Sequence, residues 1–453
     1  HGMLVLKSLP KRTRPSIAYL LTKLGFREYA ITVNIESVDV DKLIEKEQKE
    51  LNRVEGDYES LKKVKLLGQQ LVIYRKSSDN SVVAMSDLCV HRGAALSGGE
   101  VKDDCIVCPY HGWEYEPDGS VRKIPAHPDK GIPRKARIDS YPVQEKYRFI
   151  WIYMGDLPEA ERPPLPDWSA IDDTETYRAV TGSFLWKSNY ERILENGVDV
   201  AHTPFVHGGV FGNREKPEVP DFEVEEGPWH CKVSVKLNPP RSKGIWGMIN
   251  PNKQDLKNRP QVPVSTTWWM PNMILLEIDT PMGALKIFDV NIPIDEETTL
   301  VKFVALRTFF KGKWADRDAR RRVFKVLYED EAVVNGVRPE LLPFDLSAEL
   351  HVKSDYNAVL YRRRRQELID RGWSVEGNTI VGEGPARVEA RVIPSPIRKE
   401  VPELASAWNF KEVRSKELLG KRVEREARGD VPRTDTNGTT ESTDQTRGEE
   451  VPA

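Results

Sequence analysis

Two short pairs of potential metal ligands constrain this chain more than any other feature of its sequence. Cys89-Val-His91 and Cys108-Pro-Tyr-His111 are separated by sixteen residues, and a glycine lies shortly after each pair. Each pair is short enough to lie in one hairpin-like loop, so the two loops could enclose one metal centre. Two thiolates and two imidazoles match an iron–sulfur cluster in which histidine replaces cysteine on one of the two irons. The soft sulfur atoms would hold one iron and the nitrogen atoms the other.

A zinc site is the alternative for these ligands. Cys105-Ile-Val-Cys108 is also a C-x-x-C motif, and zinc accepts mixed cysteine and histidine ligands. The wider strings "CVHRGAALSGGE" and "CPYHGWEYEPDGS" resemble the Rieske motif of ring-hydroxylating oxygenases almost residue for residue. The resemblance implies that a 2Fe-2S Rieske cluster is held by Cys89, His91, Cys108 and His111. Cys105 is then a spare buried thiol, the commonest role of a free cysteine.

A second group of potential ligands lies in "NYERILENGVDVAHTPFVH". Asn196, Asp199 and His202 recur every three residues, which predicts that they lie near one another along a helix face. His207 is five residues further on and would point elsewhere on a straight helix. Pro204 disfavours helical geometry at the residue before it and can bend the chain, so that both imidazoles can meet one ion. Two histidines near a helix end also fit capping or a hydrogen bond in the core.

A helix expected over roughly residues 316 to 335 supplies a candidate carboxylate. Its apolar stripe is formed by Val323, Val326, Leu327, Val333 and Val334. Asp330 falls on this stripe at the i+3 and i+4 spacings. Because an unpaired buried carboxylate is expensive, Asp330 should have a cation as its partner. Glu329 lies one step round the helix, toward Arg322 and Lys325, and is predicted to form a solvated ion pair.

The order of polar residues in the second group resembles the mononuclear iron motif of Rieske oxygenases, and it follows the cluster motif at that family's usual separation. The residues concerned are Asn189, Glu195, Asn196, Asp199, His202 and His207. The resemblance implies a mononuclear Fe(II) held by His202, His207 and Asp330, with open positions for dioxygen. It also implies that Asp199 bridges a cluster histidine and an iron histidine by hydrogen bonds. Asn189 would be a polar neighbour of the iron.

The resemblance covers about residues 64 to 370 and is closest to single-component-type α subunits that hydroxylate or demethylate, including those that tailor saxitoxin-like alkaloids. It implies an oxygenase that takes electrons from an external reductase or ferredoxin, and from NAD(P)H only indirectly. The expected reaction is monooxygenation of a medium-sized, largely apolar or natural-product substrate; oxidative O- or N-demethylation and dihydroxylation are alternatives. A head-to-tail homotrimer is implied as well. A zinc-stabilised binding protein and a ferredoxin-like carrier are the rival classes.

The fold class expected is α+β. Short β-rich runs from Val64 to about Tyr153 predict a small antiparallel β domain, and alternation from Phe222 to Phe310 predicts a larger antiparallel sheet. With the helices, the resemblance makes the larger unit a helix-grip, START-like catalytic domain. The expected divisions are a partly helical extension (1–63), a Rieske domain (64–156), a Pro-rich linker (157–168), a catalytic domain (169–425) and a disordered tail (426–453).

Composition excludes several other classes of function. The 68 basic and 70 acidic residues nearly cancel, which argues against nucleic acid or an anionic membrane as a partner. No apolar run reaches the length needed to span a bilayer. Four cysteines are too few for a disulfide framework and suit a cytoplasmic or other reducing compartment. Between Met3 and Arg27 there are six Lys or Arg and no acid, which fits either an organelle transit segment or a basic surface segment.

The substrate pocket is expected to be lined from the 205 to 345 region. Its apolar strings are "GIWGMINP", "TTWWMPNMILLEI" and "PMGALKIFDV". Trp, Met and aliphatic side chains of this kind suit a mostly apolar ligand, although the same residues could equally form the core of a sheet.

Overall fold

The structure is a computed structural model, and it describes residues 61–208, 212–239, 261–371, 378–381, 390–401 and 412–414. Three features expected from the sequence lie outside these residues: the N-terminal extension up to residue 60, the pocket string at 244–251 and the tail at 426–453.

The first part of the described chain contains ten short strands and no α-helix among its described residues. The strands are β1 (Lys62–Leu66), β2 (Gln69–Arg75), β3 (Val82–Ser86), β4 (Glu100–Lys102), β5 (Cys105–Val107), β6 (Glu114–Tyr115), β7 (Val121–Lys123), β8 (Ser140–Tyr141), β9 (Val143–Lys146) and β10 (Phe149–Ile152). They form antiparallel sheets in the orders β1-β2-β3-β8, β4-β5-β6-β7 and β10-β9. The small antiparallel β domain is therefore confirmed.

The larger part is built on one seven-stranded sheet of order β11-β17-β16-β15-β14-β13-β12, with antiparallel pairing throughout. The strands are β11 (Arg178–Trp186), β12 (Glu223–Glu226), β13 (His230–Leu237), β14 (Val262–Trp269), β15 (Met273–Thr280), β16 (Gly283–Pro293) and β17 (Thr299–Arg307). In β13, Cys231, Val233 and Val235 are buried and alternate with less buried residues, so one face packs on the core. The predicted antiparallel sheet is confirmed.

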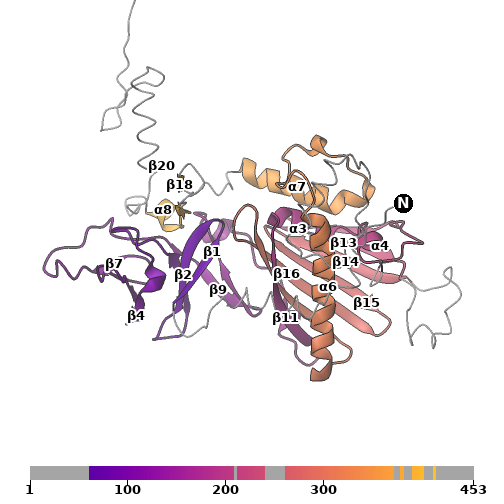
Figure 1. The fold of residues 1–453 in the computed structure, drawn as a ribbon, viewed down its shortest axis with the longest axis horizontal. Helices are drawn as coiled ribbons and strands as arrows, with labels where there is room; N and C mark the ends of the chain where they lie inside the picture. Colours follow the sequence, from indigo (N-terminus) through magenta and orange to yellow (C-terminus); the bar gives the residue numbers. More distant parts are fainter. Residues whose placement is uncertain are drawn as a thin grey trace, which may run out of the picture. The chain divides into compact units, whose positions relative to one another are not determined.

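Helices cover this sheet, and α6 crosses its face (Figure 1). The described helices are α3 (Tyr190–Val198), α4 (Thr203–Val206), α6 (Asp316–Val334), α7 (Tyr356–Asp370) and α8 (Ile397–Glu400). α3 packs on β14, β15 and β16, and α6 packs on β11. The long helix starts at the expected residue and ends one residue early. Val333 is 49% exposed and so does not belong to the apolar stripe, whereas Phe324 is buried against Phe184 and Phe303.

A segment that follows the region of family resemblance, which ends at about residue 370, packs against the small β domain. The short strands β18 (Asn378–Val381), β19 (Ala390–Val392) and β20 (Glu412–Arg414) form a sheet of order β19-β18-β20. After β19, Ser395 and Arg398 both donate hydrogen bonds to the buried carboxylate of Asp139. Tyr141 donates to the backbone oxygen of Ile393 at 2.6 Å. Residues 390–401 are therefore tied to the β-domain by buried polar contacts.

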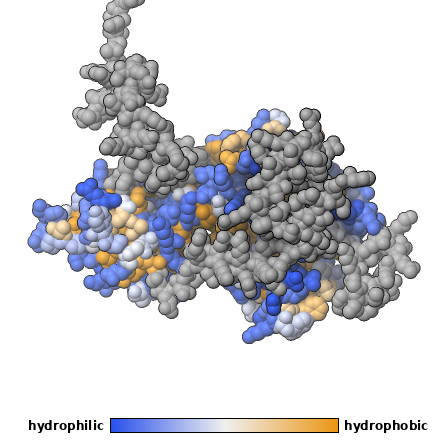
Figure 2. Space-filling view, in the orientation of Figure 1, coloured by the Kyte–Doolittle hydropathy of each residue, from blue (hydrophilic) through white to orange (hydrophobic). Residues whose placement is uncertain are grey.

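The visible surface of the described residues is mainly hydrophilic, with small hydrophobic areas between (Figure 2). None of the described helices combines the length and apolar character required to cross a bilayer.

Candidate functional site

The two cysteine–histidine pairs lie in two loops with the same backbone design. Cys89 follows β3 and Cys108 follows β5. The amide of Gly93 donates to the carbonyl of Cys89 at 2.8 Å, and that of Gly112 donates to Cys108 at 3.0 Å. Both glycines have positive φ, 70° and 68°, a conformation that a side chain disfavours. Each loop is thus a tight turn, and the glycines noted beside the ligand pairs are required by its shape.

The side chains of the two loops converge, with the sulfur atoms buried, His91 partly buried and His111 exposed. Cys89 and Cys108 are 1% and 2% exposed, whereas His111 is exposed. The ring centroids of His91 and His111 lie 4.6 Å apart. Burial raises the pKa of the Cys89 thiol, so a thiolate at this position needs a cation. Two buried sulfurs and two outer imidazoles fit the ligand set of a Rieske cluster.

Tyr115 is a partner of this site that the sequence did not suggest. Its buried hydroxyl accepts a hydrogen bond from the amide of Val90 at 3.1 Å and lies 3.0 Å from the Sγ atom of Cys89. Because the oxygen accepts from the amide, the tyrosine proton is free to be donated to the sulfur. Tyr115 belongs to the motif string "CPYHGWEYEPDGS", but the string does not show which ligand its hydroxyl meets. The contact with Cys89 depends on how the strands pair.

Replacing Tyr115→Phe should lower the reduction potential of the cluster. A hydrogen bond to a ligating sulfur stabilises the reduced, more negative state. A loss of about 1 kcal/mol corresponds to about 40 mV for one electron. A redox titration, monitored by the electron paramagnetic resonance signal of the reduced cluster, measures the shift in potential. Tyr74→Phe is the matched control, since the Tyr74 hydroxyl donates to the backbone of Asp104, and an equal shift in that variant would contradict the assignment.

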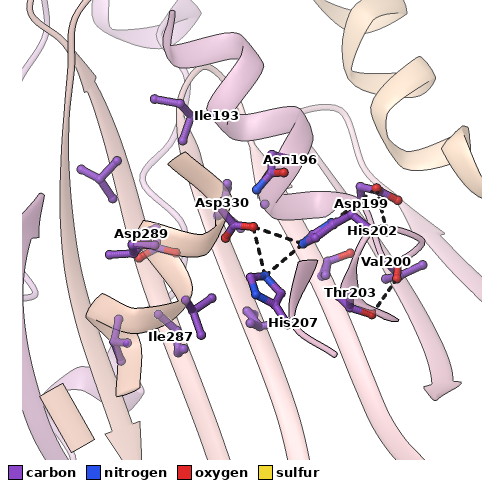
Figure 3. Close-up of a pocket in the computed structure, with 18 of the residues that line it drawn as sticks. Ile193, Asn196, Asp199, Val200, His202, Thr203, His207, Ile287, Asp289 and Asp330 are labelled. Atoms are coloured by element: carbon purple, nitrogen blue, oxygen red, sulfur yellow. Dashed lines mark hydrogen bonds and ion pairs between the residues drawn. The ribbon is translucent and has the colours of Figure 1, made fainter. Parts of the chain in front are cut away.

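A second group of ligand atoms meets between α4 and α6 (Figure 3). The Nε2 atoms of His202 and His207 lie 3.2 Å apart, and Oδ1 of Asp330 lies 3.5 Å and 3.0 Å from them. The ligand atoms all lie within 4.8 Å of one another, and within the described ranges no other group of His, Cys, Asp or Glu meets this criterion. The three residues expected to hold iron are therefore brought together.

The chain reaches this geometry differently from the helix expected. α3 ends at Val198, and Asp199 has extended backbone angles. The Asp199 carboxylate accepts hydrogen bonds from the amides of Ala201 and His202 at 2.7 and 3.1 Å, which fixes the turn after the helix. The expected bend at Thr203 is wrong, because this residue begins α4 and Pro204 occupies the first turn, where a proline costs little. The bend precedes His202 instead.

Glu329 is the clearest correction to the sequence-based expectations. It is 8% exposed rather than solvated, and its Oε2 lies 2.9 Å from Nδ1 of His207. The expected ion pair with Lys325 is present, with Nζ of Lys325 3.7 Å from Oε1 of Glu329, whereas Arg322 pairs with Asp318 instead. A carboxylate on the far nitrogen of a ligating histidine fixes the ring and its tautomer.

The charge around His207 favours a bound cation. The ring of His207 stands between two carboxylates, since Glu329 lies 2.9 Å from Nδ1 and Asp330 lies 3.0 Å from Nε2. Burial lowers the pKa of His207, but contacts with Asp330 and Glu329 raise it more, to about 9. This imbalance of acceptors and negative charge fits a mononuclear metal ion.

Asn189, expected beside the iron, serves as the N-cap of α3. Its side chain accepts from the amide of Glu191 and donates to the carbonyl of Glu296, both at 3.0 Å. It is absent from the lining of the cavity next to the histidines, where Asn196 is present. The preference of asparagine for N-caps was the signal available in the sequence.

This cavity, of about 110 Å³, lies between the sheet and the helices α3 and α6. Its apolar lining includes Leu237, Val264, Ile274, Leu276, Ile278, Ile287, Val301, Val323, Val326 and Leu327. Two of the expected strings contribute through β15 and β16, while Trp268 belongs to the core instead. Asp289 also lines the cavity, and burial and the charge of Asp330 raise its pKa to about 7. No motif or spacing in the sequence singles out this residue.

Comparison with known proteins identifies the class. Residues 43–142 match the Rieske [2Fe-2S] domain, and residues 186–371 match the Vanillate O-demethylase oxygenase C-terminal domain. Together with the two sites, these matches define a two-centre, iron-dependent oxygenase. The chain belongs to the Rieske non-haem iron oxygenases, which carry a Rieske cluster and a mononuclear iron, use dioxygen and take electrons from a reductase. The rival classes, a zinc-stabilised binding protein and a carrier without an oxygenase domain, are excluded.

Several relatives are demethylases. Methylxanthine N1-demethylase NdmA of Pseudomonas putida is 30% identical over 312 residues, which cover 67% of this chain and 82% of that protein. A vanillate O-demethylase oxygenase subunit of a Pseudomonas species is 31% identical over 164 residues, 36% of this chain and 48% of its own length. The structure of P. putida CBB5 NdmA with caffeine has a TM-score of 0.58 at 28% identity, covering 71% of this chain and 88% of that one.

Proposed function

We propose that His202, His207 and Asp330 hold the mononuclear iron, and that the Rieske cluster is held by Cys89, His91, Cys108 and His111. The convergence of three ligand atoms within 4.8 Å, at the wall of an apolar cavity, carries the first assignment. When bound, the cluster supplies electrons and the iron supplies dioxygen activation beside the substrate.

The residues around the iron ligands have separate tasks in this proposal. Glu329 holds the Nδ1 proton of His207 and so keeps Nε2 directed at the metal position. Asp199 holds the turn that carries His202 and lies 3.4 Å from its Nδ1. The aliphatic walls of the cavity exclude water and bind the hydrocarbon part of the substrate.

The proposed reaction is monooxygenation of a largely apolar substrate. Hydroxylation of a methyl carbon attached to nitrogen or oxygen gives an unstable product that releases the carbon as formaldehyde, so oxidative demethylation is one outcome of the same chemistry. The names of the relatives, which act on methylxanthines and vanillate, support demethylation.

We also propose the head-to-tail homotrimer in which Asp199 contacts a cluster histidine of the next subunit. The Asp199 side chain is 31% exposed, so it is accessible from outside. Phe205, six residues after Asp199 in the sequence, and Val352 line one surface pocket. Both are apolar and exposed, by 57% and 60%. Tyr110, next to His111, is 65% exposed as well. Sedimentation of the purified chain tests the trimer.

Metal analysis of matched cysteine variants tests the cluster assignment. The unmodified chain should contain three irons and be red-brown, whereas Cys108→Ala should lose the visible absorption and two irons. Cys105→Ala should keep both, because this thiol is buried three residues earlier and assigned no ligand role. A chain carrying zinc alone, or cluster loss in the Cys105 variant, would contradict the proposal.

A further inference from the structure

A carboxylate stands in the apolar cavity without a role in the proposed iron site. Side chains alternate along β16, so Ile287, Asp289 and Asn291 share one face, and all three line the cavity. Asp289 pairs in register with Ile274 of β15, another cavity residue. Figure 3 shows Asp289 among these lining residues, on the strand that faces the metal ligands.

No partner for this carboxyl group is found in the described part of the chain. Its Oδ1 is buried without a hydrogen bond, and the charge that acts on it is the carboxylate of Asp330. Other acids shielded from solvent are compensated: Asp139 pairs with Arg398, and Glu277 with Lys232 and Lys286. A carboxyl group in such surroundings is costly unless something donates to it.

The lining and the volume of the cavity indicate which kind of ligand donates a hydrogen bond to Asp289. With Asp330 assigned to the metal, and with Asp199 already accepting from the amides of Ala201 and His202, Asp289 is the acidic group of the lining that remains available to a ligand. Its neighbours are aliphatic, and the cavity of about 110 Å³ is comparable to the cavity of about 150 Å³ that accepts benzene. A ring-sized apolar group with one cationic nitrogen satisfies both the walls and the carboxylate.

We propose that Asp289 is a specificity-determining residue that binds a protonated amine of an otherwise apolar substrate. This inference rests on the proposed iron site, since it takes the substrate to lie in the cavity beside that site. The ammonium donates a charge-assisted hydrogen bond to Asp289, and the carbon next to the nitrogen is held at the side of the cavity that His202 and His207 line. Aromatic carboxylates are disfavoured, because their negative charge would lie against that of Asp289.

Binding of three probes of similar shape to the full, metal-loaded chain tests this proposal. The probes are N-methylbenzylamine, its neutral ether analogue benzyl methyl ether, and benzoate, with affinities measured by calorimetry. The amine should bind about tenfold to a hundredfold more tightly than the ether, and benzoate should bind more weakly than either. Asp289→Asn should remove the preference for the amine and leave the affinity for the ether unchanged, while Asp289→Glu should retain the preference.

The control is Asp279→Asn, which removes the same charge from an exposed position on β15 and should behave like the unmodified chain. Iron content and cluster absorption are measured on every sample. Equal affinity for amine and ether in the iron-loaded chain, or unchanged amine affinity in Asp289→Asn, would overturn the role of Asp289 and leave the iron site standing. Absence of the third iron in the unmodified chain would instead overturn the iron site itself.

Discussion

Asp330→Ala should leave two irons per chain instead of three and reduce turnover below detection. The variant removes the only carboxylate among the three converging ligand atoms found in the described residues. Two imidazoles with no acid hold a divalent iron far more weakly, and the affinity should fall by more than about 100-fold, beyond the loss expected for an outer partner. The cluster should keep its absorption, because its ligands lie in the separate β-sheets. Iron content after dialysis and oxygen consumption with a reductase measure both effects.

Glu329→Gln is the matched control, one residue away on the same helix. Glutamine keeps the size of the side chain and can still accept from Nδ1 of His207, but it removes the negative charge. We expect this variant to retain the iron with an affinity lowered by about 10-fold to 100-fold. If Asp330→Ala kept all three irons and full turnover, the carboxylate ligand would have to be a different residue, and Asp289 in the same cavity would be the first to test.

Asp199→Asn should keep all three irons and lose about 100-fold in coupled turnover. The asparagine oxygen can still accept a backbone hydrogen bond in the turn, which holds His202 in place. It removes the charge 3.4 Å from the Nδ1 atom of His202, and with it the bridge proposed between the two centres. The rate at which the reduced cluster is reoxidised in the presence of substrate and oxygen measures this loss.

Asn189→Ser provides the comparison for Asp199→Asn. Serine is also a good N-cap, so α3 and the iron site should be preserved, with reoxidation at the rate of the unmodified chain. A slow reoxidation in Asn189→Ser would return this residue to the role expected from the sequence. Normal reoxidation in Asp199→Asn would show that electrons reach the iron without the bridge.

The convergence of the residues proposed as ligands was predictable, because local spacing determines where they lie. The cysteine–histidine pairs each occupy one tight turn, and Asp330 was placed by the periodicity of one helix. Tyr115, Glu329 and Asp289 were not predictable in the same way, since their roles depend on which side chain a distant element brings opposite them. In the sequence, Asp289 is an ordinary strand residue. Its position in the cavity follows only from the seven-stranded sheet, which determines which face of β16 is covered.

The contacts of residues 390–401 bear on where the chain can be shortened. The match to the catalytic family ends at residue 371, yet Asp139, Tyr141 and Gln69 of the β-domain all have buried partners beyond that point. A protein trimmed to the family boundary would leave the Asp139 carboxylate in the interior without its guanidinium, a change that typically costs about 3–5 kcal/mol. The smallest cooperative unfolding unit around the cluster is therefore discontinuous in sequence, because it includes residues 390–401. Samples trimmed at residue 371 should lose the visible absorption of the cluster sooner on storage.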